Sequence, residues 1–185
     1  CYPSAAYCAL LCESGFRENY YYGMRRYPYT TNLLKNPLTF RDIDPNQASR
    51  HPGVPLSALA AGSASEPHNQ GEVWCAMLWE MRANLVAKLG FTNGNARALQ
   101  LVADGVNLAP PDPSFTEARD AILRADLASG GAHRGAIWAA FAKRGLGYSA
   151  QAPDSSTTDG IVEAFDRPDA LTVTPVGQWT PAGFE

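Results

Sequence analysis

Near residue 68 the chain changes character, because apolar residues begin to recur three or four positions apart. This spacing is typical of helices that bury one face. The longest such pattern predicts a helix from about Asn69 to Leu89, which Gly90 terminates. The predicted core residues of this helix are Val73, Trp74, Met77, Leu78, Met81, Leu85 and Leu89.

Three further helices are predicted downstream, separated by turn-forming residues. The second runs from about Ala96 to Leu108, after the turn "TNGN", and the third begins at Ser114, where Ser114 and Glu117 have the spacing of a capping box. The fourth runs from about His133 to Lys143 and stops at Gly145. The inward residues of these helices are predicted to be Leu99, Val102, Ala103 and Val106, then Phe115, Ala118, Ile122 and Ala125, then Ile137, Trp138 and Phe141.

On both sides of the helices the pattern is different. Residues 15–67 are rich in prolines and other turn formers, which predicts an irregular arm, and "ALTVTPVGQW" near the end alternates like a strand. The predicted fold is therefore mainly α: a helical bundle with an irregular arm before it and a short extended tail after it. The expected division is a lobe over 1–148, with the arm over 15–67 and helices over 68–145, and then a linker and the start of a β-rich domain over 149–185.

The composition narrows the function classes. The chain has 185 residues, 45% hydrophobic and 18% charged, with a formal net charge of -3, which argues against a nucleic-acid binder that relies on a basic field. No apolar run reaches the length of a membrane-spanning helix, so no membrane partner is expected, and no signal peptide is visible. The chain begins with Cys1 rather than methionine, so we expect its true amino terminus to lie upstream.

The four cysteines carry little information about function. Cys8 and Cys12 either form a bridge or lie one turn apart on a helix, and Cys75 is expected on the buried side of the first helix as a packing thiol. No CxxC pair exists, so a cysteine zinc site is not expected. The cysteines therefore do not indicate in which cellular compartment the protein resides.

The first group of candidate functional residues lies in the arm. The stretch "GFRENYYYGMRRYPYTTN" holds five tyrosines and three arginines, a combination that suits the binding of peptide backbone or carbohydrate through flat rings, hydroxyls and guanidinium forks. The alternative is a structural loop held by buried tyrosines. We take Arg25, Arg26, Tyr22 and Tyr27 as the candidate substrate-binding residues.

The second candidate is His68, in the stretch "PHNQGEVW" at the expected start of the most hydrophobic helix. Glu72 follows four residues later. The two share one face if the helix begins by His68, but zinc needs a third protein ligand and the HExxH motif occurs nowhere in the chain. No metal ligand is therefore assigned. His68 is either a cap or turn residue or a polar group that faces a catalytic site built elsewhere.

A resemblance extends this interpretation. The phrases "RRYPYTT", "NPLTF", "GEVW" and "FAKRGLG" occur in the order in which similar phrases occur in the carboxy-terminal half of the fungalysin family, and the match covers about Gly15 to Gly147. That family consists of secreted zinc metalloendopeptidases with a thermolysin-like catalytic core. The resemblance implies the helical lobe of such an enzyme, a secreted location, and protein or peptide substrates.

The same resemblance implies that the zinc ligands are elsewhere. In the family they come from an HExxH helix and a following GEGWxD-like helix, both upstream of the segment seen here. The implied partner is therefore the upstream zinc-binding part of the same polypeptide. We expect zinc in the intact parent enzyme, none bound by this chain alone, and no hydrolysis by the chain alone.

On this interpretation Arg25 or Arg26 binds the substrate carbonyl, and His68 and a tyrosine of "YYYG" are candidate oxyanion or orienting groups. The alternative function is a non-catalytic helical module that binds peptide or glycan through the Tyr/Arg loop.

Overall fold

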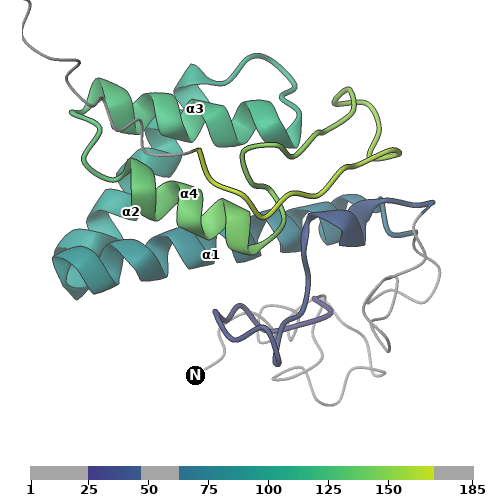
Figure 1. Ribbon diagram of the computed structural model, residues 1–185, viewed down its shortest axis with the longest axis horizontal. Coiled ribbons are helices and arrows are strands. Elements are labelled where there is room, and N and C mark those ends of the chain that lie inside the picture. Colours follow the sequence, from purple (N-terminus) through teal and green to yellow (C-terminus); the bar gives the residue numbers. More distant parts are fainter. Residues whose placement is uncertain (1–24, 47–62, 169–185) are drawn as a thin grey trace, which may run out of the picture.

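The computed structural model describes residues 25–46 and 63–168, and within these ranges the protein is mainly helical (Figure 1). Four α-helices form a bundle in which α1 (Pro67–Leu89) packs against α2 (Phe91–Leu108) and α4 (Arg134–Lys143). The remaining helix, α3 (Phe115–Ala128), packs mainly against α2. The predicted mainly α fold is therefore confirmed. None of the helices in the described ranges is long and apolar enough to span a membrane.

The core follows the predicted pattern of α1 and α4. In α1, Val73, Met77, Met81 and Leu85 are fully buried, while Trp74, Leu78 and Leu89 are half-buried and pack against them. Ile137, Trp138 and Phe141 of α4 are buried as predicted, and so are Ile122 and Ala125 of α3. The capping box of α3 is present, since the Ser114 hydroxyl accepts from the Glu117 amide and the Glu117 carboxylate accepts from the Ser114 amide.

The start of α2 differs from the prediction. The residues "TNGN", expected to be a turn, lie inside α2, which follows α1 after Gly90 alone. Gly90 makes this reversal with a φ of 79°, a conformation that favours glycine. Gly94 then lies against the backbone of α1, where a Cβ atom would be 2.5 Å from the Val86 Cα. Gly90 therefore allows the sharp reversal between the two helices, and Gly94 allows their backbones to come into direct contact near this turn.

The predicted inward stripe of α2 is wrong for three of its four residues, since Leu99, Ala103 and Val106 are exposed and only Val102 is half-buried. Leu99 is 65% exposed and Val106 is 71% exposed, whereas Ala98 and Leu101 are buried. Gly105 is also buried, and a Cβ atom there would lie 2.7 Å from the Ile122 side chain. The face of α2 that packs in the bundle therefore combines Leu101 with small residues, which permit the close approach, and Leu99 and Val106 are left facing outward.

The described part of the arm, residues 25–46, is anchored to the bundle. It contains one turn of 3-10 helix, η2 (Phe40–Ile43), and buries Leu38, Phe40 and Ile43 in the common core. Arg144, at the end of α4, is fully buried and donates to the Glu80 carboxylate of α1 at 2.8 Å and 3.0 Å. It also donates to backbone carbonyls of the arm, those of Thr30, Asn36 and Leu38.

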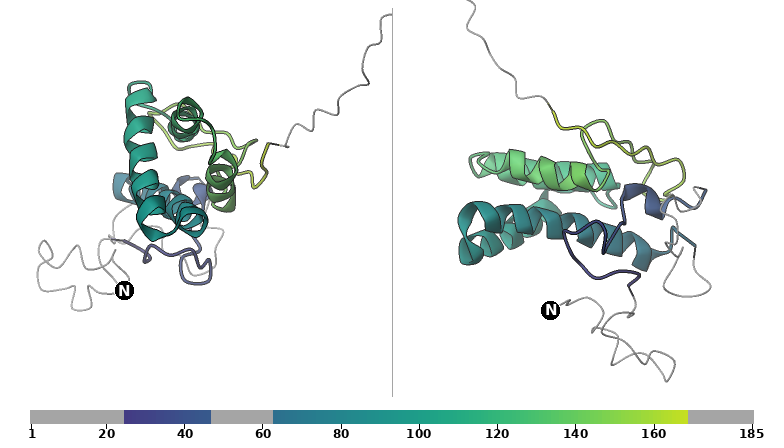
Figure 2. Two further views of the ribbon diagram at one scale, coloured as in Figure 1. Left: turned by 90° about the vertical axis from the view of Figure 1, so that its left-hand side faces the viewer. Right: turned by 60° about the horizontal axis from the view of Figure 1, so that its bottom comes forward.

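After α4 the chain returns across the lobe instead of leaving it (Figures 1 and 2). We call residues 147–166 the strap. It closes on itself through backbone bonds, including Gly147 N to Ala164 O at 2.7 Å and an antiparallel bridge between Gln151 and Val162. Ile161 of the strap is buried in the core, and the Asp44 carboxylate accepts from the Gly160 and Ile161 amides. The described part of the segment expected to be a linker thus packs against the lobe, while the alternating stretch near the end lies outside the described residues.

Candidate functional site

The amino terminus of α1 is built by Glu66. Its carboxylate accepts hydrogen bonds from the amides of His68 at 3.0 Å and Asn69 at 3.3 Å, so Glu66 is the cap of the helix. Pro67 occupies the first helical position, where a missing amide costs nothing. His68 is therefore the second residue of α1, and its ring has no capping role.

The imidazole of His68 is held by the same carboxylate. His68 Nδ1 pairs with Glu66 Oε1, while the His68 side chain remains 48% exposed. Burial acts to raise the pKa of Glu66, but the bonds from the His68 ring and from the Asn69 and His68 amides outweigh it and lower that pKa. A carboxylate that fixes one ring nitrogen leaves the other nitrogen, Nε2, as the free donor or acceptor of the imidazole.

Arg25 reaches the same end of α1 from the arm. Its Nη1 donates to the His68 carbonyl oxygen at 2.6 Å, and the residue is half-buried. The structure therefore brings together the guanidinium of Arg25 and the backbone of His68, two residues 43 positions apart in the sequence.

Arg26, the neighbour of Arg25, has a different environment. Its side chain is fully buried, and its Nε donates to Glu72 Oε2 at 2.9 Å. The other oxygen of Glu72 accepts from the Tyr27 amide at 2.7 Å, and Arg26 Nη1 donates to the Asp42 carbonyl at 3.3 Å. Burial raises the pKa of Glu72, and the charge and hydrogen bonds of Arg26 counteract part of that effect. Glu72 and Arg26 thus fasten the arm to α1 below the exposed His68.

The tyrosines of the arm are held against the same helix. Tyr27 is half-buried and packs on the core, and burial raises its pKa. The pKa of Tyr29 is also raised, first by burial and then by its contact with Cys75 of α1, and its ring lies 6.5 Å from that of Trp79. Tyr22, the remaining candidate, lies outside the described residues.

Sequence reasoning missed Glu66. Helix caps are usually Ser, Thr, Asp or Asn, so the usual residue preferences do not predict a glutamate cap before a proline. The signal was nevertheless present, because "EPH" places an acid directly before a proline that suits the first helical position. Over residues 25–46 and 63–168, no group of three or more His, Cys, Asp or Glu side chains is arranged to hold a metal ion. The described side chains therefore do not fit a zinc site by themselves.

Comparison with known proteins places this chain in a family of metallopeptidases. The family model described as "Fungalysin metallopeptidase (M36)" matches residues 13–150. The chain belongs to the fungalysin family, which confirms the resemblance drawn from its motifs.

Individual relatives agree with this assignment. The extracellular metalloproteinase MEP of Neosartorya fischeri is 39% identical over 143 residues, covering 70% of this chain and 20% of that protein. Extracellular metalloproteinase mep of Aspergillus terreus is 36% identical over 161 residues, covering 79% of this chain and 22% of that protein. Extracellular metalloproteinase 10 of Coccidioides posadasii is 35% identical over 153 residues, with 75% and 22% covered. The chain thus spans about a fifth of the length of the curated relatives it matches.

Proposed function

We propose that this chain is the carboxy-terminal, substrate-binding lobe of a secreted zinc-dependent metalloendopeptidase that hydrolyses peptide bonds in proteins. The observation that carries the proposal is the amino terminus of α1, where the half-exposed imidazole of His68 is fixed by Glu66 and flanked by Arg25. Membership of the fungalysin family and the printed names of the extracellular relatives support the reaction class and the secreted location.

In this proposal the imidazolium form of His68 donates a hydrogen bond from Nε2 to the oxyanion that develops when the scissile carbonyl is attacked, since a ring whose Nδ1–H is held by a carboxylate has a second donor only when it is protonated. A donor fixed in advance stabilises that charge without having to reorient, which is why such groups contribute strongly to catalysis. Glu66 is the positioning residue, since its carboxylate holds Nδ1 and thereby sets the direction of Nε2. The expected partner of this lobe is protein or peptide substrate.

Arg25 is proposed as the arginine that binds the substrate carbonyl. It is accessible and lies beside His68, whereas the side chain of Arg26 is buried and occupied by Glu72. Arg26 is thus proposed to act indirectly, by holding the arm in place. Tyr27 and Tyr22 remain proposed substrate contacts of the same arm.

The zinc ligands are proposed to belong to the upstream part of the polypeptide, where the family has its HExxH and GEGWxD-like helices. When bound, zinc would polarise the scissile carbonyl and activate water. The 185-residue chain is accordingly proposed to bind no zinc tightly and to hydrolyse no peptide. Metal analysis of the purified chain tests this directly, and one tightly held zinc per chain would refute it.

The test of the catalytic role is His68→Asn in the polypeptide encoded by the complete reading frame. Glu66 supplies the helix cap, so the substitution should leave the melting temperature unchanged while kcat falls by about 100- to 1000-fold. Arg25→Lys keeps the charge but loses the planar fork, and kcat/KM should fall by roughly 10- to 1000-fold. Arg124→Lys, on the exposed side of α3, is the matched control and should be silent.

The outcomes separate two functions. Unchanged turnover in both the His68 and the Arg25 variants would remove them from the catalytic machinery and favour the alternative, a non-catalytic module that binds peptide or glycan through the arm. A loss of kcat with unchanged stability in the His68 variant supports the peptidase lobe.

A further inference from the structure

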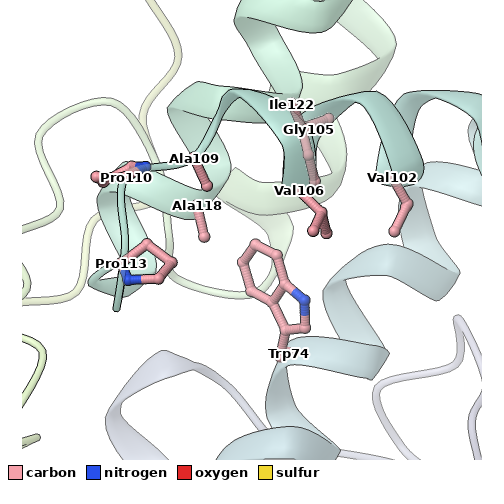
Figure 3. A pocket seen from close by; sticks show the side chains of 9 residues that line it. All are labelled: Trp74, Val102, Gly105, Val106, Ala109, Pro110, Pro113, Ala118 and Ile122. Atoms are coloured by element: carbon pink, nitrogen blue, oxygen red, sulfur yellow. The ribbon is translucent and has the colours of Figure 1, made fainter.

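An apolar groove lies between α1, α2 and α3. It has a volume of about 290 Å³. Figure 3 shows Trp74 of α1 standing at one side of it, Val102 and Val106 of α2 above, and Pro110 and Pro113 of the α2–α3 connection beside Ala118 of α3. None of the residues that line the groove is charged, so the groove suits an apolar occupant.

The groove continues into an outward stripe along α2. Val106 and Leu99 are 71% and 65% exposed, and Phe91, at the first turn of the same helix, is 67% exposed. Single exposed apolar side chains are ordinary, but a stripe at helical spacing that joins an apolar groove is typical of a surface covered by a partner. Apart from Leu101, the buried positions of α2 hold small residues, and several of the large apolar residues of this helix lie on the outside.

The attachment of the arm to α1 bears on which occupant suits this surface. Arg25 contacts His68 at the amino terminus of α1, so the polypeptide that precedes Arg25 in the sequence is tied to this end of the lobe through that residue. Trp74 lies six residues further along α1, a rise of roughly 9 Å. Because α2 doubles back along α1 after Gly90, the Val106 end of the stripe lies near the same end of α1. The matched relatives are also about five times longer than the aligned segment, which leaves ample polypeptide to cover it.

We propose that the groove at Trp74 and the outer stripe of α2 are the docking surface for the upstream part of the same polypeptide. The proposal rests on the proposed function, in which that upstream part carries the zinc ligands. An apolar segment from the upstream part fills the groove between Trp74, Val106 and Pro113, and this contact fixes the helical lobe relative to the rest of the protease.

Thiol labelling tests this surface without relying on catalysis. Val106→Cys and Leu99→Cys are compared with Leu127→Cys, a residue of α3 that is 69% exposed and does not line the groove. Each variant is prepared in the 185-residue chain and in the polypeptide encoded by the complete reading frame. The rate at which a maleimide modifies each position is followed by peptide mass mapping, which separates these thiols from the native cysteines.

The expected result is that Cys at positions 106 and 99 reacts about tenfold or more slowly in the complete polypeptide than in the short chain, while Cys at 127 reacts equally in both. Equal rates at 106 in the two proteins would overturn the proposal. Protection at 106 that grows with the concentration of the short chain would also overturn it, since the occupant would then be a second copy. Peptidase activity of the complete polypeptide is measured separately, so protection without activity would refute the proposed function alone.

Discussion

Glu72 accepts hydrogen bonds from both the side chain of Arg26 and the backbone of Tyr27, 46 and 45 residues away in the sequence. Through one buried carboxylate, the arm is fixed to the helix that carries His68. The arrangement explains why two adjacent arginines have different roles, because Arg26 holds the arm while Arg25 stays accessible beside His68. The consequences of this geometry can be measured.

Removal of Arg26 should destabilise the lobe much more than removal of Arg25. Arg26→Ala leaves the buried Glu72 without its ion-pair partner, and breaking such a pair from one side costs about 3–5 kcal/mol. Arg25→Ala, at a half-buried position, should cost about 1 kcal/mol or less. Urea unfolding of the two variants gives both values. Equal losses would show that the Arg26–Glu72 pair does not hold the arm.

Gly94 and Gly71 should respond in opposite directions to alanine. A Cβ atom at Gly94 would meet the Val86 backbone at 2.5 Å, so Gly94→Ala must push α2 away from α1 and should cost about 1–3 kcal/mol. At Gly71 no atom lies within 4 Å of the added carbon, so Gly71→Ala should stabilise α1 by up to about 1 kcal/mol. Thermal melts of both variants check the prediction, which fails if Gly94→Ala is tolerated as well as Gly71→Ala.

Two neighbours in the strap test whether it belongs to the lobe. Ile161 is 3% exposed in the core, and Ile161→Ala should lower the free energy of unfolding by about 2–5 kcal/mol. Val162, at 48% exposed, is the matched control, and its alanine variant should stay within about 1 kcal/mol of the parent. Denaturant unfolding of the chain measures both. A silent Ile161 variant would mean that the strap does not contribute to the core.

His133 should make the lobe less stable in mild acid. Burial is the largest effect on the pKa of His133 and lowers it. The Asp126 charge raises this pKa and the charges of Arg97 and Lys88 lower it, so that the net shift is downward. The folded state therefore binds this proton less readily than the unfolded state, so the contribution of neutral His133 is complete above about pH 6.5 and is lost as the pH falls through the folded pKa.

Replacing His133 with Gln should flatten the stability profile between about pH 7 and pH 5. The measurement is the urea midpoint of both proteins across that range, with His68→Asn as a control that keeps His133. A variant whose midpoint falls as steeply with acid as that of the parent would place the titrating group elsewhere.

The sequence by itself determined most of the local structure. The ends of α1 at Leu89 and α2 at Leu108, the capping box at Ser114 and the core faces of α1 and α4 all follow from periodicity and turn chemistry, which depend on residues close together in the chain. The family was also recognisable, since its phrases are contiguous runs of residues.

Only the tertiary structure decided how these parts meet. Periodicity showed that α2 has an apolar stripe at Leu99 and Val106 but not that Leu101 and the small residues face the bundle instead, because that choice depends on how closely Gly94 and Gly105 let α1 and α3 approach. The burial of Arg26 and the packing of the strap on Asp44 likewise come from contacts between residues 46 and 117 positions apart. Such contacts leave no local pattern, because their energy arises only when distant segments are folded against one another.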